Sequence, residues 1–331
     1  MLDTLTRRAI SNIPPKREEL QFLSSYPDTD ALIEAAHTVT KTCASRVFNI
    51  CTIINAKSGR CSENCQWCAQ SVHYNTGIAV TPVVSVEDAQ AALERTKANG
   101  IRRLSYVTAG RKLTPRPLKT ITKAIEATAN QGVEICASFG LQTETELRAL
   151  RRAGLTRYHC NLETSESFFP AVCTSHTFED KIQTIRSARR AGLELCSGGL
   201  FGMGETMNDR IDLAYQLRLL EIPSIPMNFL NPIPGTPLAH QPSLTDRAII
   251  RTVCIFRLIN PRAVLRFAGA CYSQMRSSKK RFMPGSMVRL SVTFSQPPEA
   301  LWSVNVRWHS KPGTPWNKIS DSRTSNTISI I

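Results

Sequence analysis

Residues 61–68 constrain this chain more than any other stretch, because they place three cysteines in a C-x3-C-x2-C pattern. Short spacers let one loop supply several thiolates to a single metal centre, and thiolates are the usual ligands of iron–sulfur clusters. Three ligands on a four-iron cluster leave one iron open for chemistry, much as a catalytic zinc site keeps an open position. The alternative is a zinc knuckle with a distant fourth ligand, although zinc fingers usually pair two ligand doublets.

The spacing is typical of the radical S-adenosylmethionine enzymes, and the surrounding segments resemble the biotin synthase family. Residues 55–60 before the motif and 69–71 after it carry family-like sequences. Other similar segments follow in the family's order, at 161–165, 196–199, 202–206 and 235–238. The resemblance therefore spans residues 47–269 and is much more specific than one motif.

The resemblance implies that Cys61, Cys65 and Cys68 are catalytic and hold a [4Fe-4S] cluster, whose open iron binds S-adenosyl-L-methionine. Reductive cleavage of that cofactor would give methionine and a 5′-deoxyadenosyl radical, which removes hydrogen from unactivated carbon. Biotin synthases use this chemistry to insert sulfur into dethiobiotin. The family also implies a homodimer that receives electrons from a flavodoxin or a ferredoxin.

Cofactor-binding residues follow from the same resemblance. Trp67 matches an aromatic position that packs on the adenosyl group. The glycine-rich run after the fifth strand would approach the cofactor with its backbone, because glycine has no side chain to prevent it. Its implied cofactor-binding residues are Gly202, Gly204 and Glu205.

Substrate-binding residues are implied around the fourth and sixth strands. Asn161 and Glu163 match contacts to cofactor and substrate, with Glu where Asp is often found. His159 would share their strand face, because side chains alternate with period two. Together with Asn228, His159 and Asn161 are the expected substrate contacts.

An auxiliary [2Fe-2S] cluster supplies the sulfur in this family and is held by three cysteines and an arginine. Cys136, Cys196 and Arg266 match three of those positions, but Ser105 occupies the fourth. Serine is a poor substitute for a thiolate on iron. Two alternatives follow: the auxiliary cluster is lost, or a variant of it uses other cysteines.

We predict a variant auxiliary cluster on Cys136, Cys196 and at least one further thiol. Cys173, on the loop after the fourth strand, and Cys160, within that strand, are the candidates. An ideal strand would turn Cys160 away from the barrel interior, because Asn161 next to it points inward. Cys51, in the first strand, is interpreted as a small core residue.

A repeated junction of helix end and strand start predicts an α/β fold. Helical segments end at Gly100, Gly132, Gly154 and Gly192, and glycine after the last turn is the left-handed cap of a helix. The predicted strands are 47–54, 101–108, 133–139, 157–163, 193–199, 224–230 and 263–268. Strands that alternate with helices predict a TIM-type (βα) barrel, with functional residues at the carboxyl ends of its strands.

The chain divides into a helical lead-in over 1–45, the barrel over 46–272, and an atypical tail over 273–331 that we expect to be disordered or irregular. Codons compatible with 282–289, read from the third base, permit Tyr-Ala-Gly-Val-Asn-Gly-Ala, which looks like the family's missing eighth strand. We infer a reading-frame shift near 270–281. The barrel would then be incomplete, with two unpaired sheet edges, and the chain an inactive relative of the family.

The net charge of +15 does not indicate a nucleic-acid partner. Residues 273–331 hold nine Lys or Arg against two Asp or Glu, and the remaining excess is spread over helices as solvated faces. No apolar run reaches the length of a membrane span, and the first residues contain no hydrophobic signal region. We expect a cytoplasmic enzyme without nucleic-acid or membrane partners, with another radical enzyme on the same barrel as the alternative.

Overall fold

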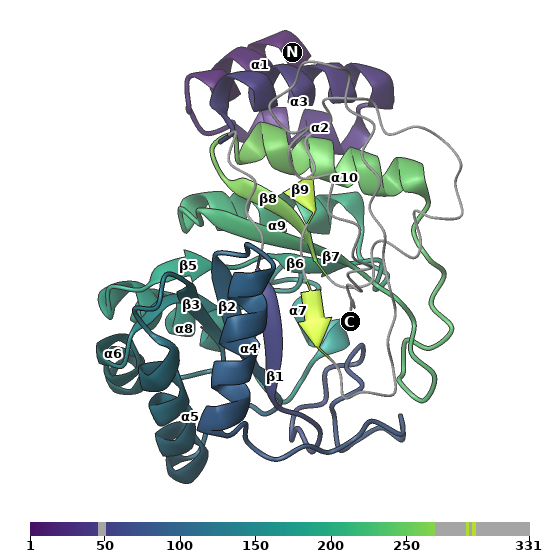
Figure 1. Cartoon of the computed structure of the whole chain (residues 1–331). Coiled ribbons are helices and arrows are strands. Elements are labelled where there is room, and N and C mark those ends of the chain that lie inside the picture. The colour runs from purple at the N-terminus through teal and green to yellow at the C-terminus, as the bar shows by residue number, and fades with distance from the viewer. Residues whose placement is uncertain (46–50, 269–288, 291–292, 296–331) are drawn as a thin grey trace, which may run out of the picture.

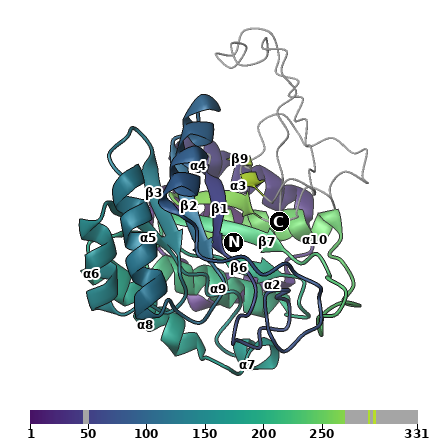
Figure 2. The ribbon, with the colours of Figure 1, turned by 60° about the horizontal axis from the view of Figure 1, so that its bottom comes forward.

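A curled sheet of parallel strands, with helices on its outer face, forms the centre of the molecule (Figures 1 and 2). The structure is a computed structural model that describes residues 1–45, 51–268, 289–290 and 293–295. Its sheet has the order β10-β1-β2-β3-β4-β5-β7-β8-β9, and β6 pairs with β7. Seven parallel βα-type strands make up the expected TIM-like half-barrel, with the fifth strand divided into β5 and β6.

The strands are β1 (Thr52–Lys57), β2 (Arg103–Thr108), β3 (Glu134–Ser138), β4 (Leu155–His159), β5 (Glu194–Cys196), β6 (Gly199–Phe201), β7 (Ser224–Phe229), β8 (Val264–Ala268), β9 (Arg289–Leu290) and β10 (Thr293–Ser295). The helices are α1 (Leu2–Ile10), α2 (Arg17–Ser25), α3 (Thr29–Cys43), α4 (Val86–Ala98), α5 (Pro115–Thr128), α6 (Glu144–Arg152), α7 (Phe169–Val172), α8 (Phe178–Arg190), α9 (Met207–Leu219) and α10 (Asp246–Ile259).

The junction glycines behave as the sequence predicts. Gly100, Gly132, Gly154 and Gly192 all have positive φ, between +63° and +109°. This left-handed conformation ends a helix at little cost only for glycine. Each junction then leads into the next strand, so these residues set the alternation of helix and sheet.

The N-terminal helices lie outside the barrel, as expected. In Figure 1, α1, α2 and α3 form a layer beside α10, and α3 packs along α10. The apolar side chains of Leu5, Leu32 and Val39 are buried in this layer. Because these residues recur at helical spacing, one face of each helix is covered by its neighbours.

The sheet stays open in the described residues, as the expected incomplete barrel implies, but its two edges are β9 and β10 rather than β8 and β1. β9 pairs with β8 through Phe267 and Leu290, and β10 pairs with β1 through Ile53 and Phe294. Both short strands come from the segment expected to be irregular. Backbone N–H and C=O groups of an edge strand can pair with any extended segment, whatever its side chains, which accounts for the difference.

Strand boundaries differ from the prediction at two places. β4 ends at His159, so Asn161 and Glu163 lie on the following loop rather than in the strand. β1 extends to Lys57, and the earlier part of its predicted span, 47–50, lies outside the described residues.

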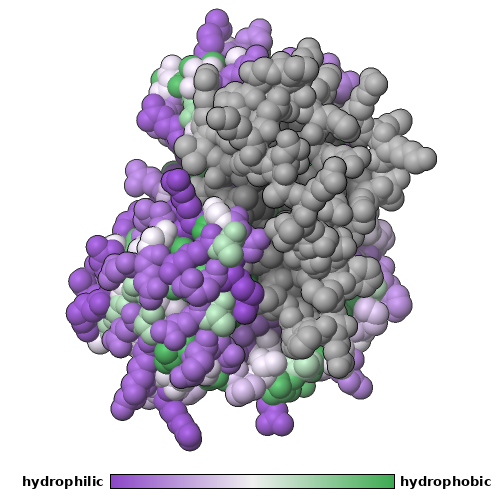
Figure 3. Space-filling model, in the orientation of Figure 1, coloured by the Kyte–Doolittle hydropathy of each residue, from purple (hydrophilic) through white to green (hydrophobic). Residues whose placement is uncertain are grey.

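The outer surface is predominantly hydrophilic where α4, α5 and α6 cover the sheet (Figure 3). The apolar core lies between these helices and the strands, with Tyr106, Ile125 and Leu147 fully buried. Among the described helices, none combines the length and the apolar character that crossing a membrane requires.

Candidate active site

The cysteine motif forms a closed loop beyond the carboxyl end of β1, where the βα pattern predicts functional residues. The Cys61 N–H donates to the carbonyl of Gln70 over 2.9 Å, and the Val72 N–H donates to the Cys61 carbonyl over 2.9 Å. Within the loop, the Cys68 N–H donates to the Cys65 carbonyl over 3.1 Å. Local backbone bonds therefore hold the three cysteines on one compact turn.

The three thiols of this loop influence one another electrostatically. Burial raises the pKa of Cys68 to about 11, and the negative charges of Cys61 and Glu163 add to the effect. Burial also raises the pKa of Cys61. The pKa of Cys65 is raised first by its contact with Cys173, then by burial, with a contribution from Cys68. Such a group favours a cation, because a bound metal replaces the protons that the thiols otherwise retain.

Cys173 belongs to this loop and not to the auxiliary site. Its Sγ lies 3.6 Å from the Sγ of Cys65 and 3.4 Å from Nδ1 of His176. Cys160 is buried in the apolar core near Lys181. The prediction that one of these two thiols joins Cys136 and Cys196 therefore differs from the structure, because the loop after β4 folds toward the cysteine motif.

The glycine-rich segment is held by Glu205, whose carboxylate is engaged within the chain. It accepts hydrogen bonds from the N–H groups of Gly202 and Met203, each over 2.8 Å, and from Nε of Arg210 over 2.8 Å. Gly202 and Gly204 have φ of +96° and +108°, which favours glycine at both positions. The carboxylate thus fixes the shape of the loop.

Trp67 connects the cysteine loop to this glycine-rich segment. Its half-buried ring packs against the cluster of buried residues that includes Val172, Leu200 and Met203. Trp67 therefore packs beside the glycine-rich segment that the family resemblance assigns to the cofactor.

The polar residues after β4 are hydrogen-bonded to the segment between β5 and β6 and to each other. Oδ1 of Asn161 accepts from the Gly198 N–H over 2.9 Å, and its Nδ2 donates to Oε2 of Glu163 over 3.2 Å. Glu163 adopts a positive φ of +74°, which is uncommon for a residue with a side chain. Nδ2 of Asn228 donates to the Gly199 carbonyl over 3.1 Å. These contacts align the three polar side chains along the β5–β7 edge of the site.

A second group of thiols lies inside the barrel: Cys136 on β3, Cys196 on β5, and Cys51 directly before β1. An interaction between the Cys51 thiol and the Cys136 thiol lowers the pKa of Cys51 and raises that of Cys136. Nη2 of Arg266 donates to Sγ of Cys196 over 2.9 Å, and Nδ1 of His159 lies 3.2 Å from the same sulfur. The interpretation of Cys51 as a core residue is therefore incomplete, because its thiol faces the auxiliary residues.

The sheet register explains why Cys51 reaches this group. Ile53 of β1 lies opposite Ser105 of β2, and Ser105 lies opposite Cys136 of β3. Cys51 is two residues before Ile53, so both point to the same face of the sheet. The sequence shows that Cys51 and Ile53 are two residues apart and so share a face. It does not show which residues of the next strands lie opposite them, and the role of Cys51 depends on that register.

Cationic side chains surround the buried thiols of this second group. Burial alone would raise the pKa of Cys196, but Arg266, His159 and Arg157 lower it to about 5. The pKa of Cys51 is lowered to about 7, first by the interaction with Cys136 and also by Arg266 and Arg103, against burial. Burial and the neighbouring Cys51 raise the pKa of Cys136 well above its ordinary value, so the cationic side chains favour the thiolate mainly at Cys196.

Arg266 retains an unused donor in this site. Its Nε is buried and has no hydrogen-bond partner among the described residues. A buried donor without an acceptor is costly, so the position fits a ligand that supplies one. Thiolates, a guanidinium and an unpaired donor in one buried place match the requirements of an auxiliary iron–sulfur cluster.

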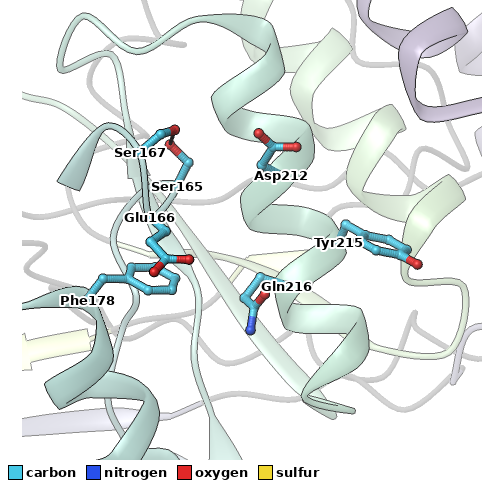
Figure 4. Close-up of a pocket in the computed structure, with 7 residues that line it drawn as sticks. All are labelled: Ser165, Glu166, Ser167, Phe178, Asp212, Tyr215 and Gln216. Atoms are coloured by element: carbon cyan, nitrogen blue, oxygen red, sulfur yellow. Dashed lines mark hydrogen bonds between the residues drawn. The ribbon is translucent and has the colours of Figure 1, made fainter. Parts of the chain in front are cut away.

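A hollow of about 430 Å³ lies outside the barrel, between the loop after β4 and α9 (Figure 4). Asp212, Tyr215 and Gln216 of α9 line it on one side, and Glu166 and Phe178 lie on the other. The seven described residues that line it include no cysteine. It is therefore separate from both thiol groups.

Two known families match the chain. The Radical SAM superfamily matches residues 56–216, and the Biotin and Thiamin Synthesis associated domain matches residues 226–292. The second match ends beyond the predicted start of the tail at 273. Together they cover both thiol groups, apart from Cys51.

Curated relatives with the name biotin synthase are similar over most of the chain. The protein from Porphyromonas gingivalis is 44% identical over 270 residues, which cover 81% of this chain and 82% of the relative. That from Desulfotalea psychrophila is 46% identical over 269 residues, with 81% and 80% covered. That from Akkermansia muciniphila is 42% identical over 292 residues, with 88% and 91% covered.

Solved structures share the fold at low identity. Methylornithine synthase (PylB) has a TM-score of 0.73 at 16% identity and covers 87% of this chain and 85% of its own. HydG, a maturase of the [FeFe]-hydrogenase, has a TM-score of 0.72 at 15% identity, with 88% and 68% covered. These similarities concern the fold alone.

Proposed function

The chain belongs to the biotin synthase family, and from that premise we propose which of its residues hold the clusters that convert dethiobiotin to biotin. Cys61, Cys65 and Cys68 hold the [4Fe-4S] cluster that binds S-adenosyl-L-methionine. The auxiliary cluster is held by Cys51, Cys136, Cys196 and Arg266. The observation that carries this assignment is the sheet register, which sets Cys51 on the same sheet face as Ser105 and Cys136, together with the hydrogen bond from Arg266 to Cys196.

When bound, the two clusters supply the reducing electron for cofactor cleavage and the sulfur for insertion. The chain's own residues bind and orient the cofactor and the substrate, and they exclude water. Trp67 and the backbone at Gly202 and Gly204 form the cofactor side of the site. Asn161 and Glu163 present an amide and a carboxylate beside them, already aligned by their mutual hydrogen bond.

His159 acts as a positioning residue in this proposal. Its ring lies 3.2 Å from Sγ of Cys196 and helps to keep that sulfur a thiolate. Asn228, fixed by the Gly199 carbonyl, remains the proposed substrate contact on β7. Ser105 lacks a thiolate, which was the reason to consider a different radical enzyme on the same barrel. Cys51 removes that reason in the proposal, because it adds a thiol on the same sheet face.

Three further features are proposals that the family suggests. The chain would act as a cytoplasmic homodimer, and light scattering of the purified protein measures the dimer. A flavodoxin or ferredoxin would supply the electrons. The division at 45 and 272 and the reading-frame shift near 270–281 also remain predictions, and resequencing the gene tests the shift.

Anaerobic reconstitution with isotopically labelled sulfide tests the proposed function. We expect biotin to form from dethiobiotin and to carry the label, because the auxiliary cluster is the sulfur source in the proposal. Product mass spectrometry measures both. Cleavage of S-adenosyl-L-methionine without any biotin would contradict the proposal and would favour another radical enzyme.

A further inference from the structure

A third group of metal-binding side chains lies next to the cysteine loop. Cys65 on that loop and Cys173 and His176 on the loop after α7 bring their ligand atoms within 4.8 Å of one another. Cys173 is 3% exposed and His176 is 8% exposed. Neither Cys173 nor His176 has a role in the proposed function.

Two of the three ligand-atom distances in this group match a tetrahedral site, and the third, from Sγ of Cys65 to the His176 ring, is no more than 4.8 Å. With metal–sulfur bonds of about 2.3 Å and metal–nitrogen bonds of about 2.0–2.1 Å, tetrahedral ligands lie about 3.5–3.8 Å apart. The two sulfurs of Cys65 and Cys173 are 3.6 Å apart, and Sγ of Cys173 is 3.8 Å from Nε2 of His176. Two thiolates and an imidazole form a common donor set for zinc, and they leave one position open.

The carboxylate of Glu63 supports the histidine as a ligand. Its Oε2 lies 2.5 Å from Nδ1 of His176 and accepts from Oγ of Ser175 over 2.8 Å. Metal-binding histidines usually donate their second ring N–H to such a carboxylate, which fixes the ring and its tautomer. With the proton on Nδ1, Nε2 is the nitrogen that can bind a metal.

The two loops that carry these ligands are fastened together. Oδ1 of Asn64 accepts from the N–H groups of Thr174 and Ser175, each over 3.0 Å. The Gln66 N–H donates to the Val172 carbonyl over 3.0 Å. The ligand positions are therefore set before any ion arrives, which lowers the entropy cost of binding.

We propose that, in the cluster-free chain, Cys65, Cys173 and His176 bind one divalent transition-metal ion of the Zn²⁺ or Fe²⁺ type. This ion and the [4Fe-4S] cluster exclude each other, because both require the sulfur of Cys65. The site differs from a zinc knuckle on the C-x3-C-x2-C motif, since it uses neither Cys61 nor Cys68. The metal site stands on its own geometry, whereas the exclusion rests on the proposed function.

Cobalt binding to the full-length, cluster-free protein under anaerobic conditions tests the site. We expect one Co²⁺ per chain with a thiolate-to-cobalt absorption band, retained in Cys61→Ser and in the control Cys254→Ser, a buried cysteine of α10. Cys173→Ala and His176→Gln should each lose the band. Glu63→Gln should weaken binding by about 10–100-fold, as loss of an outer carboxylate usually does. A band that survives both ligand substitutions, or that disappears in Cys61→Ser, would overturn the site.

Competition with the cluster gives the second measurement. Zn²⁺ added before iron and sulfide should slow the appearance of the cluster's absorbance at least about tenfold, compared with the same protein without zinc. In Cys173→Ala the slowing should be less than about twofold. Equal slowing in both would overturn the exclusion. A chain that never forms the cluster but still binds cobalt through Cys173 would instead contradict the proposed function.

Discussion

The two thiol groups assigned to clusters differ in how the fold builds them. Cys61, Cys65 and Cys68 lie within eight consecutive residues on one loop, and local backbone bonds hold them. Cys51, directly before β1, and Cys136, in β3, are both buried, and only the register of the sheet brings them to the same face.

The difference extends to the charge of the thiols. In the loop, burial and neighbouring negative charges raise the pKa of Cys68 to about 11, so a metal must displace a proton there. In the barrel, Arg266, His159 and Arg157 overcome the effect of burial and lower the pKa of Cys196 to about 5. The loop therefore gains its Cys68 thiolate from the metal, whereas the barrel supplies the Cys196 thiolate in advance even though the pKa of Cys136 beside it is raised.

The comparison also shows how each site can change. A loop ligand is replaceable by small backbone movements, as the approach of Cys173 to Cys65 illustrates. A ligand held by a sheet has less freedom to move, so in the proposed assignment Cys51, directly before the neighbouring strand, takes the place of a thiol at Ser105. The compensation is possible because both residues point to the same face of the sheet.

The largest expected effect comes from the loop. Cys68→Ser should remove about four irons per chain and abolish cleavage of S-adenosyl-L-methionine, because an alkoxide is a poor ligand for iron. Biotin formation should stop as well, although the barrel keeps its own iron. Iron analysis and product chromatography measure the effect, with Cys254→Ser as the control. Retention of full iron in Cys68→Ser would remove the distinction between the sites.

A smaller and more selective effect is expected in the barrel. Cys51→Ala should lower the iron content by about two or more irons and reduce biotin formation at least about 100-fold, while cofactor cleavage persists. Cys160→Ala, a buried thiol in the apolar core, is the matched control and should keep its iron. If Cys160→Ala loses auxiliary iron and Cys51→Ala does not, the strand-based assignment is wrong.

The proposed loop site can be recognised in the sequence, whereas the proposed barrel site depends on the fold. The cysteine motif, Trp67 and the glycine-rich run are contiguous, so each can be recognised in the sequence. The role of Cys51 depends on which strands are neighbours and how they are aligned, and a single sequence does not contain that information. Helix caps such as Gly100 were predictable because one residue determines the local conformation.

The two short edge strands, β9 and β10, were also not predictable from the sequence. The tail gave no periodic pattern, and its pairing with both sheet edges arises from backbone hydrogen bonds that leave no side-chain signal. Likewise, Glu163 was placed on a strand because alternation fitted, whereas β4 ends four residues earlier at His159. Boundaries of this kind depend on tertiary contacts that one chain segment does not reveal.

Adding one methyl group tests how rigid each region is. A Cβ on Gly198, inside the barrel, would lie 1.9 Å from the Pro226 carbonyl oxygen, so Gly198→Ala should lower the free energy of unfolding by about 2–3 kcal/mol. Gly77, near the cysteine loop, has φ of +66° and no atom within 4 Å of its Cβ position. Gly77→Ala should cost only about 1 kcal/mol, for the left-handed conformation. Urea titration measures both, and equal losses would contradict the contrast.

The smallest expected effect concerns the hydrogen bonds by which Asn64 joins the cysteine loop to the loop after α7. Asn64→Ala removes the hydrogen bonds to Thr174 and Ser175, each worth about 0.5–1.5 kcal/mol, and should let the loop open more often. A chelator should then extract the loop iron about three to ten times faster, while auxiliary iron leaves at an unchanged rate. Ser62→Ala, whose hydroxyl contacts only Glu63 over 3.3 Å among the described residues, is the control. Faster release of both kinds of iron would mean that the loop and the barrel open together, so that their difference in construction would not extend to their dynamics.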